Sequence, residues 1–312
     1  MNVPAKLAVY GLGLVVAFTG AFGAGRWLGP VAPASAAPDH AAAPEETPGG
    51  YPVDADVPAG LRISADGYTL DPVDAPEEAG ERADLVFRVL GPDGAPVTDF
   101  AGSHEKRMHL IVAARDLGGY QHLHPEMAED GTWSVPLELA EPGPYRMFAD
   151  FVPDGGTGTT LGADIAVPGE YRPRPLPEES RTAEVDGYTV ELAGGLVPGT
   201  TSELAFTVRE AESGTPVTDL QPYLAAYGHL VALRDGDLGF LHVHPEGEPG
   251  DGATPSGPEI GFAAEVPSAG TYRLYLDFRH DGEVRTAEFT VTAAGDGEPA
   301  PAPGSGGTGH GH

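Results

Sequence analysis

Histidines recur in one arrangement at two places in this 312-residue chain. His109 precedes the run His122-Leu123-His124-Pro125-Glu126 by 13 residues, and His229 precedes the run His242-Val243-His244-Pro245-Glu246 by the same 13 residues. Alternate residues of a β-strand point to one side of a sheet, so each His-x-His pair would present two imidazoles on one face. Because imidazole is the commonest side-chain ligand of metal ions, the duplicated pattern predicts a small metal site in each copy.

A structural role is the alternative interpretation of the same histidines. A single histidine on a strand more often makes hydrogen bonds within the fold than binds a ligand. The dipeptide His-Pro can also simply end a strand, since proline has no N–H to donate. Both interpretations remain open from the sequence alone.

The composition limits which other groups could bind a metal ion or another partner. With no cysteine, the chain has no disulfide framework, no thiolate nucleophile and no cysteine-based zinc site, so a metal must be held by histidine, methionine and carboxylate. The formal net charge of −30 argues against a nucleic-acid partner, because phosphate binding depends on Lys and Arg. The acidity itself serves solubility or attracts cations.

The N-terminal residues predict export from the cytoplasm. No charged residue occurs from Leu7 to Gly25, and at ~1.5 Å per residue this stretch spans roughly the hydrocarbon core of a bilayer. It is longer than the ~7–15 apolar residues of an ordinary signal peptide, which favours a membrane anchor, although Ala34-Ser35-Ala36 resembles a cleavage site. In both cases the rest of the chain lies outside the cytoplasm, anchored to the cell membrane or, alternatively, secreted.

Internal repetition and composition predict the domain organisation. The run Asp-Gly-Tyr-Thr at 66–69 recurs at 186–189, and Ala149-Asp150-Phe151 corresponds to Leu276-Asp277-Phe278, so the chain is a tandem duplication. Stretches rich in proline and glycine bound the two copies. The predicted parts are a signal peptide or anchor at 1–28, a Pro/Ala-rich spacer at 29–52, a first repeat at 53–168, a Pro-rich linker at 169–182, a second repeat at 183–294 and a disordered tail at 295–312.

Short apolar runs bounded by Gly, Pro and Asp predict β-strands, in the first repeat at 84–90, 109–115, 120–124, 132–139, 145–151 and 163–167. Several strands in about 115 residues indicate an all-β fold with two tandem immunoglobulin-like β-sandwich domains, following an N-terminal transmembrane or signal helix. Tyr145 and Tyr272 each follow a glycine by two residues where a strand begins. This placement resembles the tyrosine corner before strand F of the immunoglobulin-like fold.

The order of strands in that fold would bring the candidate ligands together. If 145–151 is strand F, then 109–115 is strand C and 120–124 is strand C′ of the same sheet, and C runs antiparallel to both neighbours. The start of C then lies beside the ends of C′ and F. The predicted metal ligands are His109, His122, His124 and Asp150 in the first repeat, with His104 nearby, and His229, His242, His244 and Asp277 in the second.

Several residues have properties that argue against a role in metal binding or against a bound cation beside them. Lys106 and Arg107 disfavour a cation, although their long side chains can point into water. Met108 is expected to pack in the core rather than bind a metal. Asp150 and Asp277 are expected to bond nearby N–H groups or an arginine more often than a metal, as short acids at strand ends commonly do.

Catalysis is not indicated by the sequence. The chain has no Gly-x-Ser-x-Gly elbow, phosphate loop or dinucleotide fingerprint. A site at the rim of a small sandwich also lacks the deep pocket that catalysis normally needs. We therefore expect a binding protein rather than an enzyme.

These residues resemble those of immunoglobulin-like copper-handling domains from bacterial metal-resistance systems, which hold copper with His, Met and Asp at a sheet rim. Over residues 60–167 and 185–292 the chain is also similar to membrane-anchored tandem-domain proteins of high-GC Gram-positive bacteria, described as heavy-metal-binding, with a His-Leu-Ile-Val…His-Leu-His-Pro core. The resemblance implies copper as the bound metal and a metal transporter or another envelope protein as partner. The Met-rich segment that favours Cu(I) is missing, so Cu(II) or, alternatively, zinc is easier to support.

The leading functional hypothesis is an extracytoplasmic metal-binding protein that buffers or delivers copper through a rim histidine cluster in each repeat. It predicts about two bound metal ions per chain, one for each predicted site. The alternative is an immunoglobulin-like adhesion or assembly module whose histidines are structural and bind no metal.

Overall fold

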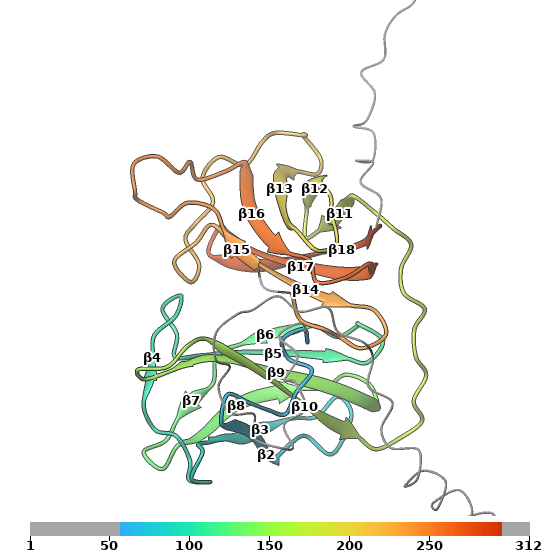
Figure 1. Ribbon diagram of the computed structural model, residues 1–312. Coiled ribbons are helices and arrows are strands. Elements are labelled where there is room, and N and C mark those ends of the chain that lie inside the picture. Colours follow the sequence, from blue (N-terminus) through green and yellow to red (C-terminus); the bar gives the residue numbers. More distant parts are fainter. Residues whose placement is uncertain (1–56, 242, 295–312) are drawn as a thin grey trace, which may run out of the picture. The chain divides into compact units, whose positions relative to one another are not determined.

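The computed structural model describes residues 57–241 and 243–294, and both repeats lie within one structural unit, Asp54–His312. The predicted N-terminal anchor, the spacer, the C-terminal tail and His242 lie outside the described residues. Within those described ranges, no helix is long and apolar enough to cross a membrane. The described residues form strands, turns and loops, which confirms the predicted all-β class (Figure 1).

Two antiparallel sheets form the first repeat. One has the order β1-β2-β3-β8-β7 and the other the order β10-β9-β5-β6, with β4 paired to β9. This is the A-B-E-D and G-F-C-C′ arrangement of an immunoglobulin-like sandwich, as predicted. The strands are β1 (Ser64–Ala65), β2 (Tyr68–Asp74), β3 (Arg82–Leu90), β4 (Phe100–Ala101), β5 (Met108–Ala114), β6 (Gln121–Leu123), β7 (Glu126–Met127), β8 (Thr132–Glu138), β9 (Gly143–Pro153) and β10 (Thr159–Val167).

The second repeat follows the same plan with one difference. Its sheets have the orders β11-β12-β13-β16-β15 and β14-β17-β18. Strand β15 pairs with β16, whereas the corresponding His-x-His segment of the first repeat forms β6 and pairs with β5. The strands are β11 (Thr182–Val185), β12 (Tyr188–Gly194), β13 (Thr201–Glu210), β14 (Gly228–Arg234), β15 (Val243–Pro245), β16 (Glu259–Glu265), β17 (Gly270–His280) and β18 (Glu283–Ala293).

The prediction that the second His-x-His segment lies beside strand C is therefore wrong. Leu241 stands where the first repeat has Gln121, and it is 1 % exposed in the core of the second repeat, with Val243 packed against that core. The Leu241 amide still donates to the Ala232 carbonyl oxygen in β14 at 2.9 Å, and with Leu241 and Val243 packed in the core the chain then continues onto the other sheet. His244 consequently pairs with Ala263 in β16.

A tyrosine fixes the start of strand F in each repeat. The Tyr145 hydroxyl donates to the carbonyl oxygen of Glu141 at 2.8 Å, and the Tyr272 hydroxyl donates to that of Ser268 at 2.8 Å. A tyrosine bonded back to the chain a few residues upstream is the tyrosine corner of immunoglobulin-like domains, so this prediction is confirmed. The two corners position β9 and β17, the strands that carry the aspartates of interest.

The two repeats pack against each other through strand β5. All seven of its residues are buried, although a strand of an isolated sandwich alternates between core and solvent. Leu110 and Val112 lie in the core of the first repeat. Ile111 and Ala113, on the opposite face, belong to a second apolar cluster that includes Val231 of the second repeat. One face of β5 therefore serves the core and the other serves the interface.

Aromatic contacts across this interface are reciprocal. Tyr120 of the first repeat stacks on Tyr275 of the second, with ring centroids 4.1 Å apart. Phe240 occupies the position of Tyr120 in the second repeat, and its ring lies 5.6 Å from that of Phe148 in β9. Each repeat thus offers one aromatic ring before its His-x-His pair and one from strand F, so the repeats contact each other through equivalent surfaces.

The segment before β1 bonds to both repeats. The Gly60 amide donates to the Thr160 carbonyl oxygen in the first repeat at 3.1 Å, and the Phe240 amide in the second repeat donates to the Ala59 carbonyl oxygen at 3.0 Å. The buried Arg146 guanidinium donates to the Gly60 carbonyl oxygen as well. This segment is held by β9, β10 and the second repeat together.

Candidate functional site

Strands β5 and β6 bring three histidines to one face of the first repeat. Ile111 in β5 lies opposite His122 in β6, and continuing this register by two residues places His124 opposite His109. Because alternate residues share a face, the three histidines lie on the same side as Ile111, which packs in the interface between the repeats. They therefore face the second repeat rather than the core of the first.

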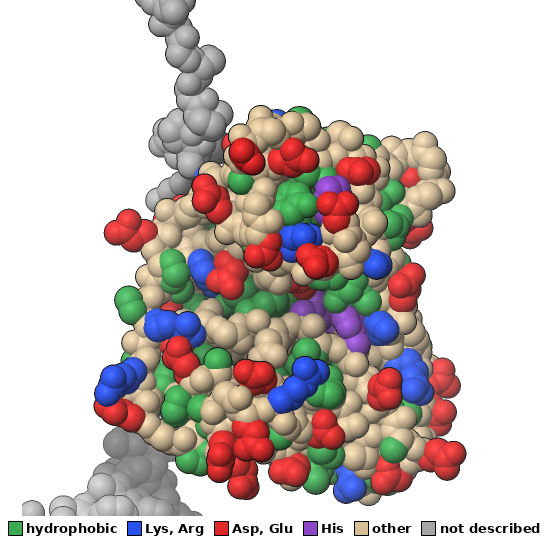
Figure 2. All heavy atoms as spheres, turned by 180° about the vertical axis from the view of Figure 1, so that it is seen from behind, with side chains coloured by type: hydrophobic (Ala, Val, Ile, Leu, Met, Phe, Trp, Pro, Cys, Tyr) green, Lys and Arg blue, Asp and Glu red, His purple; other side chains and the backbone are tan. Residues whose placement is uncertain are grey.

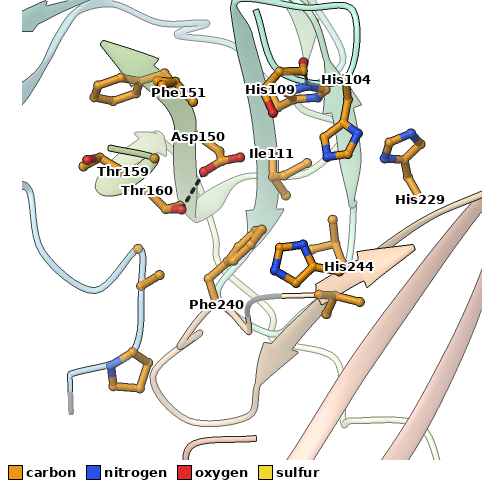
Figure 3. A pocket seen from close by; sticks show the side chains of 18 of the residues that line it. His104, His109, Ile111, Asp150, Phe151, Thr159, Thr160, His229, Phe240 and His244 are labelled. Carbon is orange, nitrogen blue, oxygen red and sulfur yellow. Dashed lines mark hydrogen bonds between the residues drawn. The ribbon is translucent and has the colours of Figure 1, made fainter. Parts of the chain in front are cut away.

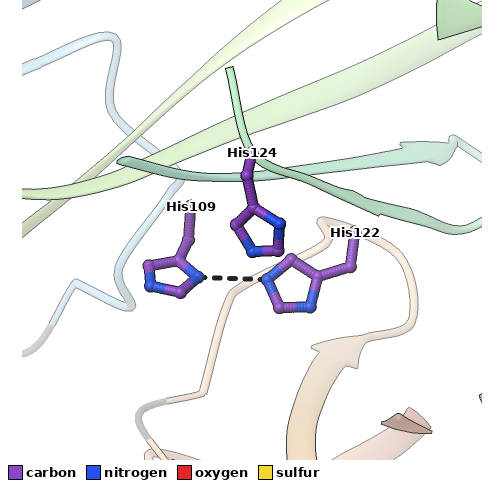
Figure 4. Close-up of side chains that lie close together, drawn as sticks. All are labelled: His109, His122 and His124. Carbon is purple, nitrogen blue, oxygen red and sulfur yellow. Dashed lines mark hydrogen bonds between the residues drawn. The ribbon is translucent and has the colours of Figure 1, made fainter. Parts of the chain in front are cut away.

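One nitrogen from each of His109, His122 and His124 lies within 4.8 Å of the others (Figure 4). Nδ1 of His109 is 3.2 Å from Nε2 of His122, and the three ring centroids are 4.9 to 5.4 Å apart. Among residues 57–241 and 243–294, no other group of three potential metal ligands is as close. These three side chains are called the His cluster below.

Two acceptors determine which nitrogens of the cluster carry hydrogen. Nε2 of His109 lies 3.0 Å from the Ser103 carbonyl oxygen, and Nδ1 of His122 lies 2.9 Å from a carboxylate oxygen of Asp277. Both oxygens can only accept, so these two nitrogens donate. When both imidazoles are neutral each has one N–H, and the nitrogens that face each other at 3.2 Å are then both lone-pair acceptors. Such a pair attracts a shared proton or a metal ion.

The third member of the cluster presents a further nitrogen without a partner. Nε2 of His124 is buried and makes no hydrogen bond. Burial lowers the pKa of His124 to about 3 and that of His109 to about 4, and the neighbouring His122 contributes to both shifts. Both rings are therefore uncharged at neutral pH, which is the state in which histidine binds metals.

The second repeat contributes a buried carboxylate to this site. Asp277 lies in β17 and is 2 % exposed. One carboxylate oxygen accepts from His122 and, at 3.4 Å, from the Tyr120 hydroxyl, while the other accepts from the Thr286 hydroxyl at 2.6 Å. A carboxylate bonded to the second N–H of a metal-binding histidine fixes the ring and makes it a better ligand.

Two further histidines lie next to the cluster. Nε2 of His229 donates to the carbonyl oxygens of Tyr223 and Leu224, both at 3.0 Å, and burial lowers the pKa of His229 to about 4. Its ring centroid is 6.1 Å from that of His122 and 5.4 Å from that of the exposed His104. His229 and His104 thus flank the cluster at a greater distance than its members have from one another.

The second repeat does not gather its own predicted ligands among the described residues. Asp277 bonds to the first repeat, and His244 is exposed on β15, outside the His cluster. Asp150 lies opposite His109 in the β5–β9 register and accepts a hydrogen bond from Thr160 at 2.7 Å. His242 is not described. The residues that could be placed form one cluster at the interface instead of the two separate sites predicted.

A cavity of about 410 Å³ adjoins the His cluster (Figure 3). Its polar side chains include Asp150 and Thr160, joined by a hydrogen bond, and its apolar side chains include Ile111 and Phe240. Seen from one face, histidine side chains reach the surface of the molecule amid many acidic groups (Figure 2). The histidines that line the cavity are His104, His109, His122, His229 and His244.

The geometry of the cluster suits a metal ion bound by imidazoles. Bonds of about 2.0–2.1 Å at tetrahedral angles separate two ligand nitrogens by roughly 3.3 Å, close to the 3.2 Å between His109 and His122. The 4.8 Å limit that encloses all three nitrogens is wider, so His124 would have to lie closer to the other two rings to bind the same ion. Three imidazole nitrogens without cysteine match Zn(II) and Cu(II).

Three residues that shape the site were not predicted from the sequence. Ser103 supplies the carbonyl that orients His109, and Tyr120 and Thr286 donate to Asp277. No side-chain motif marks a backbone carbonyl or a hydroxyl as a partner. The interface itself had a signal in the sequence: the run from Leu110 to Ala114 is apolar without alternation, which is typical of a strand buried on both faces.

Comparison with known proteins gives a family and distant structural likenesses. A family model described as a domain of unknown function matches residues 63–169 and again residues 183–295, and it names no metal-handling family. No curated protein matches the chain.

Among solved structures, a putative membrane-anchored protein from Corynebacterium diphtheriae aligns at 12 % identity over 76 % of this chain and 60 % of its own, with a TM-score of 0.21. Invasin, a bacterial integrin-binding protein, aligns at 12 % identity over 73 % of this chain and 39 % of its own, with a TM-score of 0.20. The FN1–FN3 domains of chicken CNTN1 align at 10 % identity over 76 % and 69 %, with a TM-score of 0.19. Likenesses at this level carry no argument about function.

Proposed function

Since the chain belongs to the DUF8832 family and carries that domain twice, we propose a function for the pair: an extracytoplasmic metal-binding protein that buffers or delivers Cu(II) or Zn(II). The observation that carries the proposal is the His cluster. Three imidazoles converge there, two with facing nitrogens oriented by outer hydrogen bonds and one with a buried nitrogen that has no partner. A bound metal ion would accept electron pairs from all three nitrogens.

The choice of ion follows from the donor set. Met108 and Met147 lie in the core of the first repeat and are at most 1 % exposed, so they offer no thioether to the cluster. Imidazole without a soft sulfur ligand suits Cu(II) and Zn(II) better than Cu(I). Since the described residues form one His cluster, we expect one tightly bound ion per chain from this part of the molecule.

The cellular setting is part of the same proposal. The predicted N-terminal anchor or signal would place the repeats outside the cytoplasm, attached to the membrane or secreted. A transporter or another envelope protein would then receive or supply the ion. The chemistry assigned to the cluster is binding, and no catalytic step is proposed for it.

Titration of the full chain, purified in detergent, with Zn(II) and Cu(II) at pH 7 tests the proposal. We expect one equivalent to bind in competition with a chelator of known affinity. The double variant His109→Ala/His124→Ala should lose this binding, while His244→Ala, which changes an exposed histidine outside the cluster, should keep it. A wild-type chain that takes up neither ion would refute the proposed function.

A structural role for the histidines is favoured by one observation. His109 and His229 both donate Nε2–H to the carbonyl oxygen of the residue six positions earlier, Ser103 and Tyr223, although His229 is not in the cluster. This shared bond shapes the loop before strand C in both repeats. Under this alternative the protein is an adhesion or assembly module, and replacing His122 and His124 by Ala lowers the melting temperature while leaving its activity unchanged.

A further inference from the structure

We propose that the metal site is shared between the two repeats, with Asp277 of the second repeat positioning His122 of the first, so that metal binding and docking of the repeats stabilise each other. This inference rests on the proposed metal-binding function and deepens it. It makes Asp277 a positioning residue rather than a ligand, in contrast to the role predicted from the sequence.

The carboxylate of Asp277 is buried, and its ion-pair partner among the described residues is His122. Its side chain is 3 % exposed, and its described partners are His122 and the hydroxyls of Tyr120 and Thr286. Within the described part of the chain, no Lys or Arg forms an ion pair with it. Burying a carboxylate without a cation is costly. A metal ion on the far nitrogen of His122 would place a lasting positive charge on the far side of the imidazole ring from Asp277.

Residues of both repeats orient the two histidines whose nitrogens face each other in the His cluster. Ser103 of the first repeat orients His109, and Asp277 of the second orients His122. The point between the two facing nitrogens is therefore defined by atoms of both repeats. If the repeats separated, His122 would lose the partner that holds its Nε2 toward His109.

Asp150 is the equivalent of Asp277 in the first repeat. Asp150 also lies on strand F opposite the first histidine of its own strand C, and Thr160 donates to it as Thr286 does to Asp277. The aspartate–threonine pair is thus common to both repeats. The bond to a histidine of the other repeat is the feature that connects Asp277 to the His cluster.

Coupling between two equilibria is reciprocal. If docking of the second repeat strengthens metal binding, metal binding must strengthen docking by the same factor. Loss of a carboxylate that orients a metal-binding histidine typically weakens metal affinity by about 10- to 100-fold. The same factor should appear as a smaller fraction of molecules with an open interface when the metal is bound.

The test compares the full chain, in detergent, with and without Zn(II), using chelator competition for affinity and amide hydrogen exchange for docking. In wild type we expect zinc to slow exchange in β5 and β6 and also, by about 10-fold or more, in β14 and β17 of the second repeat. Asp277→Asn keeps the size of the side chain but removes its charge. It should bind zinc about 10- to 100-fold more weakly and lose the added protection in β14 and β17.

Two further variants control for folding and for charge. Thr286→Val, which removes one donor to Asp277 without changing its size, should shift affinity and protection in the same direction as Asp277→Asn. Asp219→Asn removes a charge from an exposed aspartate of the second repeat that bonds His280, and it should leave both readouts at wild-type values. Melting curves without metal identify any variant that fails to fold. The zinc-dependent change in hydrogen exchange is measured on wild type itself, so this part of the test does not depend on a variant folding.

The outcomes separate this inference from the proposed function. Zinc uptake with slower exchange confined to the first repeat would overturn the shared site and leave the metal-binding function standing. Unchanged affinity and protection in a folded Asp277→Asn protein would do the same. No uptake of zinc by wild type overturns both.

Discussion

The phenol ring of Tyr120 lies flat on that of Tyr275, with planes 5° from parallel, and the Tyr275 hydroxyl donates a hydrogen bond to the carbonyl oxygen of Leu117. Tyr275 belongs to the second repeat and the other two residues to the first. The two repeats are therefore joined by a buried polar bond as well as by apolar contact. This junction stands next to the His cluster, because Tyr120 also donates to Asp277.

Replacing Tyr275 by Phe should destabilise the protein through the interface. The Leu117 carbonyl would lose a buried donor, and an unsatisfied buried polar group costs about 1–3 kcal/mol in the free energy of unfolding. Urea unfolding followed by circular dichroism measures the loss. Tyr171→Phe is the control, since Tyr171 is 39 % exposed and its variant should stay within about 0.5 kcal/mol of wild type. Equal midpoints for the Tyr275 variant and wild type would contradict the role of this bond.

Replacing His124 by Ala should weaken zinc binding more than any change in the residues that orient the cluster. It removes a donor atom itself, so the loss should reach or exceed the upper end of the roughly 10- to 100-fold range expected for outer partners. Chelator competition at pH 7 gives the affinity. His104→Ala, at an exposed histidine beside the cluster, should have a much smaller effect. The assignment of His124 as a ligand fails if both variants bind zinc equally well.

Stability without metal should fall as the pH drops below about 6.5. Burial lowers the folded-state pKa of His109 and His229 to about 4 and that of His124 to about 3, whereas in the unfolded chain they titrate near 6.5. Between these values the unfolded chain binds protons that the folded chain does not, so the free energy of unfolding decreases toward acid pH. More than about one pH unit above 6.5 these groups are almost entirely neutral in both states and contribute little slope.

Denaturant midpoints at pH 7.5, 6.5, 5.75 and 5.0 measure this dependence above the range in which most carboxylates titrate. The variant His109→Gln/His124→Gln lacks two of the three groups and should show a shallower decline. A midpoint that stays constant or rises from pH 6.5 to 5.0 in wild type would show that these histidines are not held neutral by burial.

Leu241 and Gln121 occupy equivalent positions in the two repeats but differ in burial, so replacing each by Ala should change the free energy of unfolding by unequal amounts. Leu241 is 1 % exposed in the core of the second repeat, so Leu241→Ala should cost about 2–5 kcal/mol. Gln121→Ala, at the corresponding position of the first repeat, changes a half-buried polar residue and should cost much less. Thermal or urea unfolding compares the two. Similar losses in both variants would remove the explanation given for the different strand pairing.

The fold could be predicted from the sequence more completely than the site, because strands leave local signals whereas contacts between the repeats do not. The alternation of the strands and the glycine before Tyr145 are local signals, and both were sufficient to place strand F and the sheet that holds His109 and His122. The convergence of His109, His122 and His124 followed from pairing within one repeat, so it could be anticipated. Whether the group binds metal remains a prediction.

The contribution of the second repeat could not be anticipated in the same way. Asp277 was expected beside His229 in a site of its own, and in register it does lie opposite His229. Its bond to His122 depends on how two sheets pack, which no spacing in the chain encodes. The pairing of His244 with β16 is also not predicted, because the histidine pattern is the same in both repeats and the difference lies beside it, at Leu241 and Gln121.

The segment before β1 has a mechanical consequence. Ala59 and Gly60 bond to Phe240 in the second repeat and to Thr160 in the first, so a pulling force that arrives along the chain from the N-terminal side is divided between the two domains at once. The load reaches the second repeat without passing through the whole of the first. These two bonds would have to break before strand β1 bore the load alone.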